Sequence, residues 1–231
     1  MTFSLFSAAG AEFFMRWMHY FFGVLWIGLL YYFNFVQTPF MAEAEAAAKS
    51  GVVQKLVPRA LLWFRWAAMG TFLVGWAMIG DKVGRQGMAL DSSWGVLILS
   101  GGLLGTLMWF NVWFVIWPNQ KVVIENAVRT AKGEAANPAA AASAARAGVA
   151  SRTNVLFSLP MLFFMGAASH LPISITGSVL PYWGAFAVIA GLIELNALKG
   201  KMGPMGTVKG VLHLSLALAL VLYVLLEVLT K

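Results

Sequence analysis

Three histidines stand in or beside apolar segments of a sequence that is 60% hydrophobic. His19 lies in RWMHYFFGVLWIGLLYYFNFVQ (residues 16–37), His170 closes SLPMLFFMGAASH (residues 158–170), and His213 begins a late apolar run. Ionisable groups inside membrane spans are costly and usually face the interior of a helical bundle. Because imidazole is a common axial ligand of haem iron, His19 and His170 are candidate ligands of a b-type haem.

A second interpretation needs no cofactor, because a histidine near the membrane surface can bond to a backbone carbonyl or contact Trp17. His213 is expected to have such a structural role. A non-haem metal fits the pair less well, since zinc and iron usually take three or more protein ligands. The sequence has no cysteine, which excludes thiolate sites, iron–sulfur clusters and covalently attached c-type haem. The haem and structural interpretations both stay open on the residues alone.

The first apolar segment gives His19 a polar and small-residue face. At about 100° per residue, the residues that share this face are Gly23, Trp26, Leu30, Asn34 and Gln37. Arg16 precedes His19 by about one turn, and its guanidinium matches the carboxylate geometry of a haem propionate. The gap at Gly23 leaves room for a flat ligand or a neighbouring helix. The expected cofactor-binding residues are His19, His170, Arg16, Gly23 and Trp26.

Two other ionisable residues lie within apolar segments. Arg65 in LWFRWAAMG and Glu194 in GLIELNALKG are expected to form an intramembrane ion pair or to extend to the interface. Pro160 is expected to kink the segment that ends at His170.

Six apolar segments have the length of a transmembrane helix and must position these residues: 13–36, 61–80, 94–117, 153–171, 179–198 and 209–229. Only 11% of the residues are charged, against about 25% in soluble domains. The sequence therefore predicts an all-α, polytopic membrane bundle that forms a single transmembrane domain over residues 1–231.

Basic residues alternate between the loops. The loops after spans one, three and five hold eleven of them: Lys49, Lys55, Arg59, Lys121, Arg129, Lys132, Arg146, Arg152, Lys199, Lys201 and Lys209. The opposite side holds Arg16, Lys82, Arg85 and Lys231. The positive-inside rule places both termini in the periplasm, if the membrane is a bacterial inner membrane. Topology thus explains the net charge of +7, and no nucleic-acid partner is expected.

The third loop has helical features. Lys121, Glu125 and Arg129 follow helical spacing, and residues 139–150 are rich in alanine, the best helix former. These patterns predict a cytoplasmic helical hairpin between spans three and four. The alternative is a flexible alanine-rich linker.

Two longer segments resemble a known family. GTLMWFNVWFVIWPNQKVVI (residues 105–124) and SRTNVLFSLPMLFFMGAASHLP (residues 151–172) are similar to the urate oxidase N-terminal family, the membrane domain of bacterial cytochrome c urate oxidases. The positions that match the family pattern are His19, Asn111, Pro118, Gln120, Asn154, Pro160 and His170. The resemblance implies a membrane redox protein that oxidises urate to 5-hydroxyisourate. Because the sequence has no C-x-x-C-H motif, the expected electron acceptor is a separate periplasmic cytochrome c or another carrier.

Two alternative functions remain. The H-x-x-x-G-x-x-W-x-G pattern of the first span also resembles haem-binding protoporphyrinogen oxidases of the HemJ type. A non-catalytic subunit that packs in an oligomer or a larger membrane complex through its small and aromatic residues is the other alternative.

Overall fold

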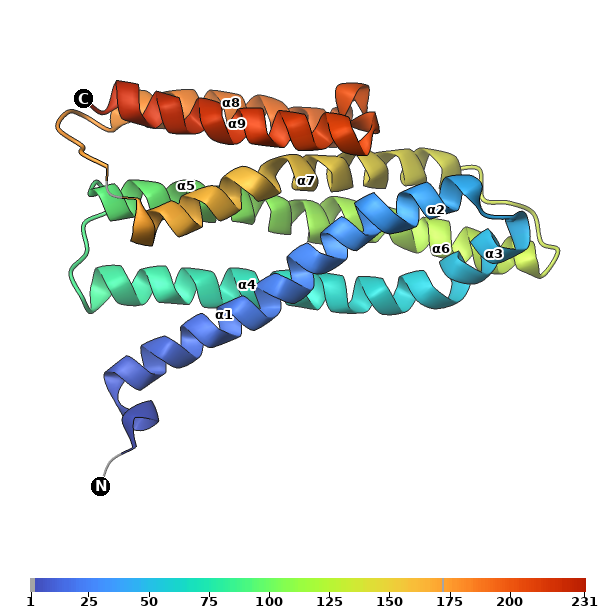
Figure 1. Ribbon diagram of the computed structural model, residues 1–231. Coiled ribbons are helices and arrows are strands. Elements are labelled where there is room, and N and C mark those ends of the chain that lie inside the picture. The colour runs from blue at the N-terminus through green and yellow to red at the C-terminus, as the bar shows by residue number, and fades with distance from the viewer. Residues whose placement is uncertain (1–2, 172) are drawn as a thin grey trace.

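The computed structural model describes residues 3–171 and 173–231. Within these ranges the chain forms helices and no β-strand, and its long helices run side by side in alternating directions (Figure 1). Both termini lie at one end of the bundle (Figure 1), which we call the terminal end. The opposite end carries the helical hairpin described below, and we call it the hairpin end. The all-α prediction is confirmed.

Three of the long helices are composite, because a π-helical segment joins two α-helical parts. They are α1 (Ala8–Tyr31), η2 (Tyr32–Gln37) and α2 (Thr38–Glu43); α3 (Ala46–Gly51), η3 (Val52–Leu56) and α4 (Val57–Gly84); and α5 (Ser93–Phe110), η4 (Asn111–Ile116) and α6 (Trp117–Ala131). The remaining long helices are α7 (Ala140–His170), α8 (Leu180–Lys199) and α9 (Val208–Leu229). Short 3₁₀ turns, η1 (Ser4–Phe6) and η5 (Gly203–Gly206), precede α1 and α9.

A proline follows each π-helical segment by two residues: Pro39, Pro58 and Pro118. A proline has no N–H, and its ring clashes with the carbonyl four residues earlier. In all three helices that carbonyl belongs to the wide π turn. The residue before the proline bonds to the carbonyl five residues back, as Trp117 N–H does to Val112 O. The wide turn thus accommodates the ring and lets the helix continue.

Five helical segments of the described residues are long and apolar enough to cross a membrane. They are Ala8–Glu43, Ala46–Gly84, Ser93–Ala131, Leu180–Lys199 and Val208–Leu229. They contain five of the six predicted spans, and the protein is therefore a multi-pass membrane bundle. The sixth prediction, residues 153–171, lies in α7, which is not among the five. Figure 1 shows α7 running antiparallel to α5 along the bundle, so this segment also connects the hairpin end to the terminal end.

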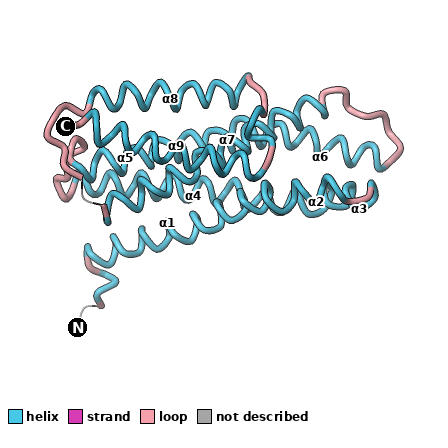
Figure 2. The backbone as a smooth tube through the Cα atoms, turned by 45° about the horizontal axis from the view of Figure 1, so that its top comes forward, coloured by secondary structure: helices cyan, strands magenta, loops and turns pink. Residues whose placement is uncertain are grey.

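Helix α7 is the centre of the core. It packs against α5, α8 and α9, and the tube view shows it among these helices (Figure 2). Its inner residues, including Val155, Phe157 and Phe164, are fully or almost fully buried. Leu104 of α5 and Leu222 of α9 are also fully buried.

The expected kink at Pro160 is present, since Figure 1 shows α7 bending along its length. The proline leaves the carbonyl of Leu156 without its helical N–H partner. The hydroxyl of Ser215 in α9 donates to this carbonyl at 2.7 Å. The kink in α7 is thereby tied to α9.

The predicted hairpin is helical. Helix α6 ends at Ala131, a short loop follows, and α7 begins at Ala140. Asn137 N–H donates to Asn126 Oδ1 at 2.7 Å, which ties the loop to α6. The prediction of a helical hairpin is confirmed and the alternative of a flexible linker is wrong. Its cytoplasmic position stays a prediction.

Helix α1 packs mainly on α4. Figures 1 and 2 both show the N-terminal half of α1 leaning away from α5, α7 and α9. Glycines on α4 permit the close approach. A Cβ on Gly70 would lie 2.6 Å from the ring of Phe22, and a Cβ on Gly75 would lie 2.9 Å from Cε1 of His19.

Candidate functional site

His19 lies where α1 packs on α4. Its imidazole is half-buried, and it contacts the backbone at Gly75, where a side chain would collide with the ring. The Nδ1 side of the ring is buried against α4, beside Gly75 and the backbone of Thr71. An imidazole held in this way keeps its metal-ligating capacity.

The polar face predicted on the first span points inward. Trp26, Leu30 and Asn34 are buried. Asn34 Nδ2 donates to Ser151 Oγ of α7 at 2.8 Å, which joins the first helix to the core. At Gly23 the neighbour is a helix, because Thr71 of α4 has its Cγ2 atom 4.0 Å from the position of an added Cβ. The gap predicted at Gly23 thus faces α4, at a distance where a methyl group would make ordinary van der Waals contact.

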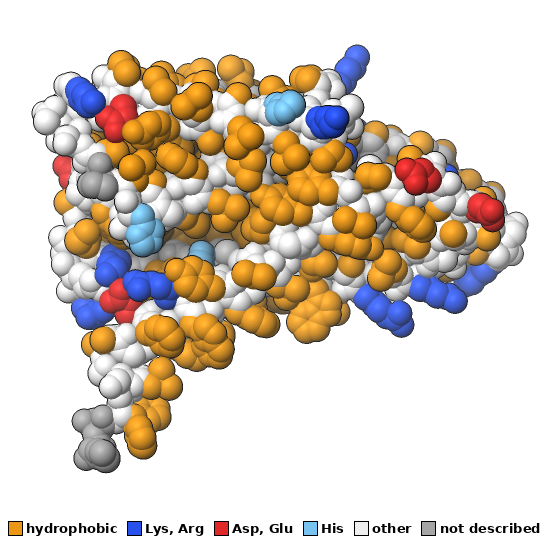
Figure 3. Space-filling model, viewed as in Figure 1, with side chains coloured by type: hydrophobic (Ala, Val, Ile, Leu, Met, Phe, Trp, Pro, Cys, Tyr) orange, Lys and Arg blue, Asp and Glu red, His pale blue; other side chains and the backbone are white. Residues whose placement is uncertain are grey.

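His170 and His213 are exposed. His170 is the last residue of α7 and lies toward the terminal end, whereas His213 lies in the first two turns of α9 toward the hairpin end. Figure 3 shows histidine atoms beside and inside a hollow near the terminal end, over α7 and α1. This arrangement agrees with the prediction that His213 is separate from the other two.

Arg16 belongs to a cluster of charges at the terminal end. It donates to Glu12 Oε1 at 2.8 Å, and Lys82 at the end of α4 pairs with the same oxygen at 2.9 Å. Arg85 pairs with Asp81 at 2.7 Å, and this carboxylate raises the pKa of Arg85. Arg16 thus has a carboxylate partner within the chain, and this cluster links the start of α1 to the end of α4.

A second polar centre lies inside the bundle, toward its hairpin end. Asn111 Nδ2 donates to Asn154 Oδ1 at 3.1 Å and to Glu194 Oε2 at 3.0 Å. Asn154 Nδ2 donates to the carbonyl of Met108 at 3.0 Å. Asn111 and Asn154 are fully buried and Glu194 is 8% exposed. Helices α5, α7 and α8 therefore meet at this centre through one hydrogen-bonded network.

Sequence reasoning named two members of this centre but missed their contact with the third. Asn111 and Asn154 were matched to the family pattern, and the structure brings them together. Gln120, the third polar position of the pattern, is only half-buried and lies two turns further along. The contact of Glu194 with this centre depends on how α8 packs against α5 and α7. A local sequence pattern does not contain that information.

Arg65 does not pair with Glu194, so the expected ion pair is wrong. The Arg65 guanidinium lies 3.8 Å from the centroid of the Trp117 ring. Trp113 Nε1 donates to the Arg65 carbonyl at 3.1 Å. Cation–π contact with tryptophan is a common arrangement for arginine, and here it joins α4 to η4 and α6.

Comparison with known proteins identifies one family. The family model described as urate oxidase N-terminal matches residues 87–198, just under half of the chain. The matched range contains α5 to α7 and all of α8 except Lys199, and with them the polar centre and His170, but it does not include His19. No curated protein and no solved structure matches the chain. Through residues 87–198 the protein matches the urate oxidase N-terminal family, as the motifs in its sequence predicted.

Proposed function

We propose that the protein is a haem-binding redox protein of a bacterial inner membrane and that it oxidises urate to 5-hydroxyisourate. It works as a single transmembrane domain over residues 1–231, surrounded by lipid. The oxidation takes an oxygen atom from water and releases two electrons and two protons. A separate periplasmic cytochrome c, or another acceptor, takes the electrons.

The observation that carries the haem proposal is the imidazole of His19. It lies within a membrane helix, and its Nδ1 side packs against Gly75 and the backbone of Thr71 on α4. This packing fixes the ring orientation and leaves Nε2 as the nitrogen that could ligate a metal. His170, exposed at the end of α7, is the proposed second ligand.

The chain's own residues would hold and orient the cofactor. His19 and His170 would hold the haem through their imidazoles, and Trp26 would add a buried aromatic surface on the same side of α1. Arg16 would have to leave Glu12 to reach a propionate, and its exposed position permits this. Haem, when bound, supplies one-electron transfer between substrate and acceptor.

The test is a pyridine haemochrome assay and an optical spectrum on protein purified in detergent after growth with ample haem. The wild type is expected to contain haem with a low-spin spectrum, because two imidazoles ligate the iron. His19→Ala should lose the haem, and His170→Ala should give a high-spin spectrum or no haem.

His213→Ala is the matched control, because this histidine is exposed toward the other end of the bundle, and its spectrum should equal that of the wild type. Haem-loaded protein should also consume urate and reduce added cytochrome c. A His19→Ala protein with full haem and an unaltered spectrum would show that the ligand assignment is wrong. A wild type without haem would favour the structural interpretation of both histidines.

A further inference from the structure

The contact between Asn111 and Glu194 leaves two oxygen atoms without partners. Asn111 Nδ2 donates to Glu194 Oε2 at 3.0 Å. Asn111 Oδ1 and Glu194 Oε1 are buried, and neither has a hydrogen-bond partner among the described residues. The same two side chains therefore share one hydrogen bond and carry one unpartnered acceptor each.

A proton on the carboxyl group would give both atoms a hydrogen-bond partner. A protonated carboxyl has one O–H donor beside its carbonyl oxygen, and a primary amide has a donor and an acceptor in the same relative positions. Glu194 Oε1–H can donate to Asn111 Oδ1 while Asn111 Nδ2–H donates to Glu194 Oε2. The result is a cyclic acid–amide pair with two hydrogen bonds.

An ionised Glu194 would leave a negative charge in the apolar interior with little compensation. Burying a charge is costly unless it is paired. Helix α5 and η4 contain no ionisable side chain. On α9 the ionisable residues are Lys209, His213, Tyr223 and Glu227, none of which is buried.

Helices α7 and α6 do not supply a partner either. On α7, Arg146 and His170 are exposed, and buried Arg152 has an unpartnered Nη1 atom and no ion pair with Glu194 among the described residues. Lys121, Glu125 and Arg129 on α6 lie beyond the π turn, further toward the hairpin end.

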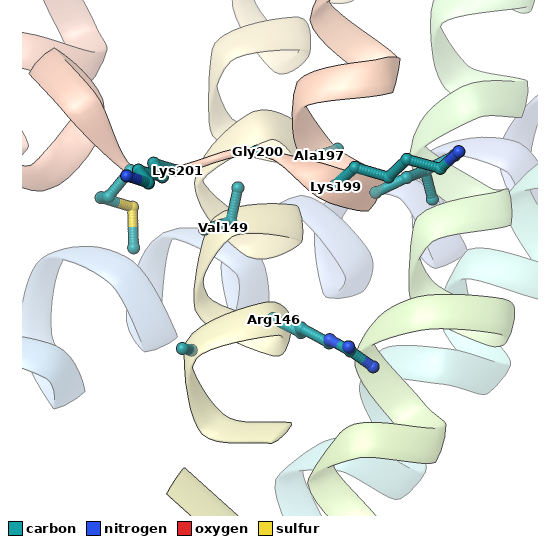
Figure 4. A pocket seen from close by; sticks show the side chains of 9 residues that line it. Arg146, Val149, Ala197, Lys199, Gly200 and Lys201 are labelled. Atoms are coloured by element: carbon teal, nitrogen blue, oxygen red, sulfur yellow. The ribbon is translucent and has the colours of Figure 1, made fainter. Parts of the chain in front are cut away.

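A cavity of about 500 Å³ lies at the hairpin end, between α7, the end of α8 and the loop that follows α8. Figure 4 shows Val149 of α7 and Ala197 of α8 in it, with Arg146 and Lys199 extending to one side and Lys201 to the other. Ala197 follows Glu194 by three residues, about 4.5 Å along the helix axis. Of the residues that line the cavity, Ala197 is thus the nearest to Glu194 along α8.

We propose that Glu194 and Asn111 form a proton-binding site in the membrane interior, with the carboxyl neutral in the folded protein, and that the cavity at the hairpin end is the route of this proton. The ligand of the site is the proton itself. The site needs no cofactor, so this proposal and the haem proposal can be tested independently.

Infrared spectroscopy of the purified protein in lipid nanodiscs tests the protonation state. At neutral pH the wild type should show the C=O stretch of a protonated carboxyl, and this band should shift in D₂O. The band should be absent in Glu194→Gln and present in the matched control Glu125→Gln, which changes a carboxylate on α6. Glu194→Gln should keep its thermal midpoint within a few degrees, because an amide can donate where the acid did, whereas Glu194→Leu should lower it.

A wild type without the band, or a band that survives in Glu194→Gln, would overturn the proton site. A band that appears only when sodium and potassium are removed would assign the site to a cation and would also overturn it. The route is tested by hydrogen–deuterium exchange of the band. Ala197→Val should slow this exchange several-fold, and the exposed substitution Ala187→Val on the same helix should not. Equal exchange rates in the two variants would refute the route.

Discussion

At the scale of single residues, glycines on α4 determine how closely α1 can approach. Gly70 and Gly75 have Phe22 and His19 in the space that a side chain would occupy. Other glycines on α4 have no neighbour there: an added Cβ at Gly80 would meet no atom within 4 Å. Glycine therefore serves helix packing at Gly70 and Gly75 and has no packing role at Gly80, further along the same helix.

This difference gives a stability prediction. Gly70→Ala should lower the free energy of unfolding by about 1–3 kcal/mol, because the methyl group would overlap the Phe22 ring in a packed interface. Gly80→Ala should leave it unchanged or raise it by up to about 1 kcal/mol, since alanine is the better helix former. Denaturation of both variants in the same detergent measures the contrast. Equal effects would show that α1 and α4 are not packed as described.

At this scale the sequence predicted which side chains face the core better than it predicted which residues they contact. The inward face of Trp26, Leu30 and Asn34 followed from helical periodicity, and burial confirms it. Partners depend on packing between distant segments. Arg65 and Glu194 looked like a pair of opposite charges in apolar spans, but Trp117 and Asn111 are their neighbours.

At the scale of helices, prolines organise both the composite helices and the core. Pro39, Pro58 and Pro118 each follow a wide π turn. Pro160 instead bends α7, and the Leu156 carbonyl that it leaves without a helical partner accepts from Ser215 of α9. π turns often occur at functional sites, and η4 begins at Asn111, the residue that connects the buried polar centre.

The link between Pro160 and Ser215 can be measured with a double-mutant cycle. Ser215→Ala should cost about 1–3 kcal/mol, because it leaves the buried Leu156 carbonyl without a partner. In a Pro160→Ala background the same substitution should cost less, since residue 160 then has an N–H that can donate to Leu156 O. Additive effects in the cycle would contradict the proposed compensation.

The helices themselves were largely predictable. Hydropathy and length located the six segments, and five of them coincide with helices of membrane-spanning composition. The first three long helices extend beyond their apolar segments at the hairpin end, and only the extension in α6 was predicted. The length of an apolar segment does not indicate whether the helix continues past it. The π turns were missed because local hydropathy does not distinguish them, although the prolines that follow were visible.

At the scale of the whole molecule, charge is divided between the two ends. The terminal end carries four basic residues, Arg16, Lys82, Arg85 and Lys231, and four acidic ones, Glu12, Asp81, Asp91 and Glu227. Each of these basic side chains forms a salt bridge, and Figure 3 shows red and blue atoms in contact there. The net charge of +7 therefore belongs to the rest of the chain, which includes the hairpin end.

This asymmetry predicts the orientation in the membrane. The positive-inside rule places the hairpin end in the cytoplasm and both termini outside. Alkaline phosphatase fused after Lys231 should be active, whereas the same enzyme inserted in the loop between α6 and α7 should be inactive. The opposite pattern of activities would reverse the orientation.

The same division makes the two ends respond differently to dissolved salt. Ions screen charges over about 8 Å at physiological ionic strength. At the terminal end, screening weakens the pairs that Glu12 makes with Lys82 and Arg85, and so reduces the attraction between the start of α1 and the end of α4. At the hairpin end, screening relieves repulsion among lysines and arginines that outnumber their carboxylates. Rising ionic strength should therefore loosen one end of the molecule while it makes the other more compact.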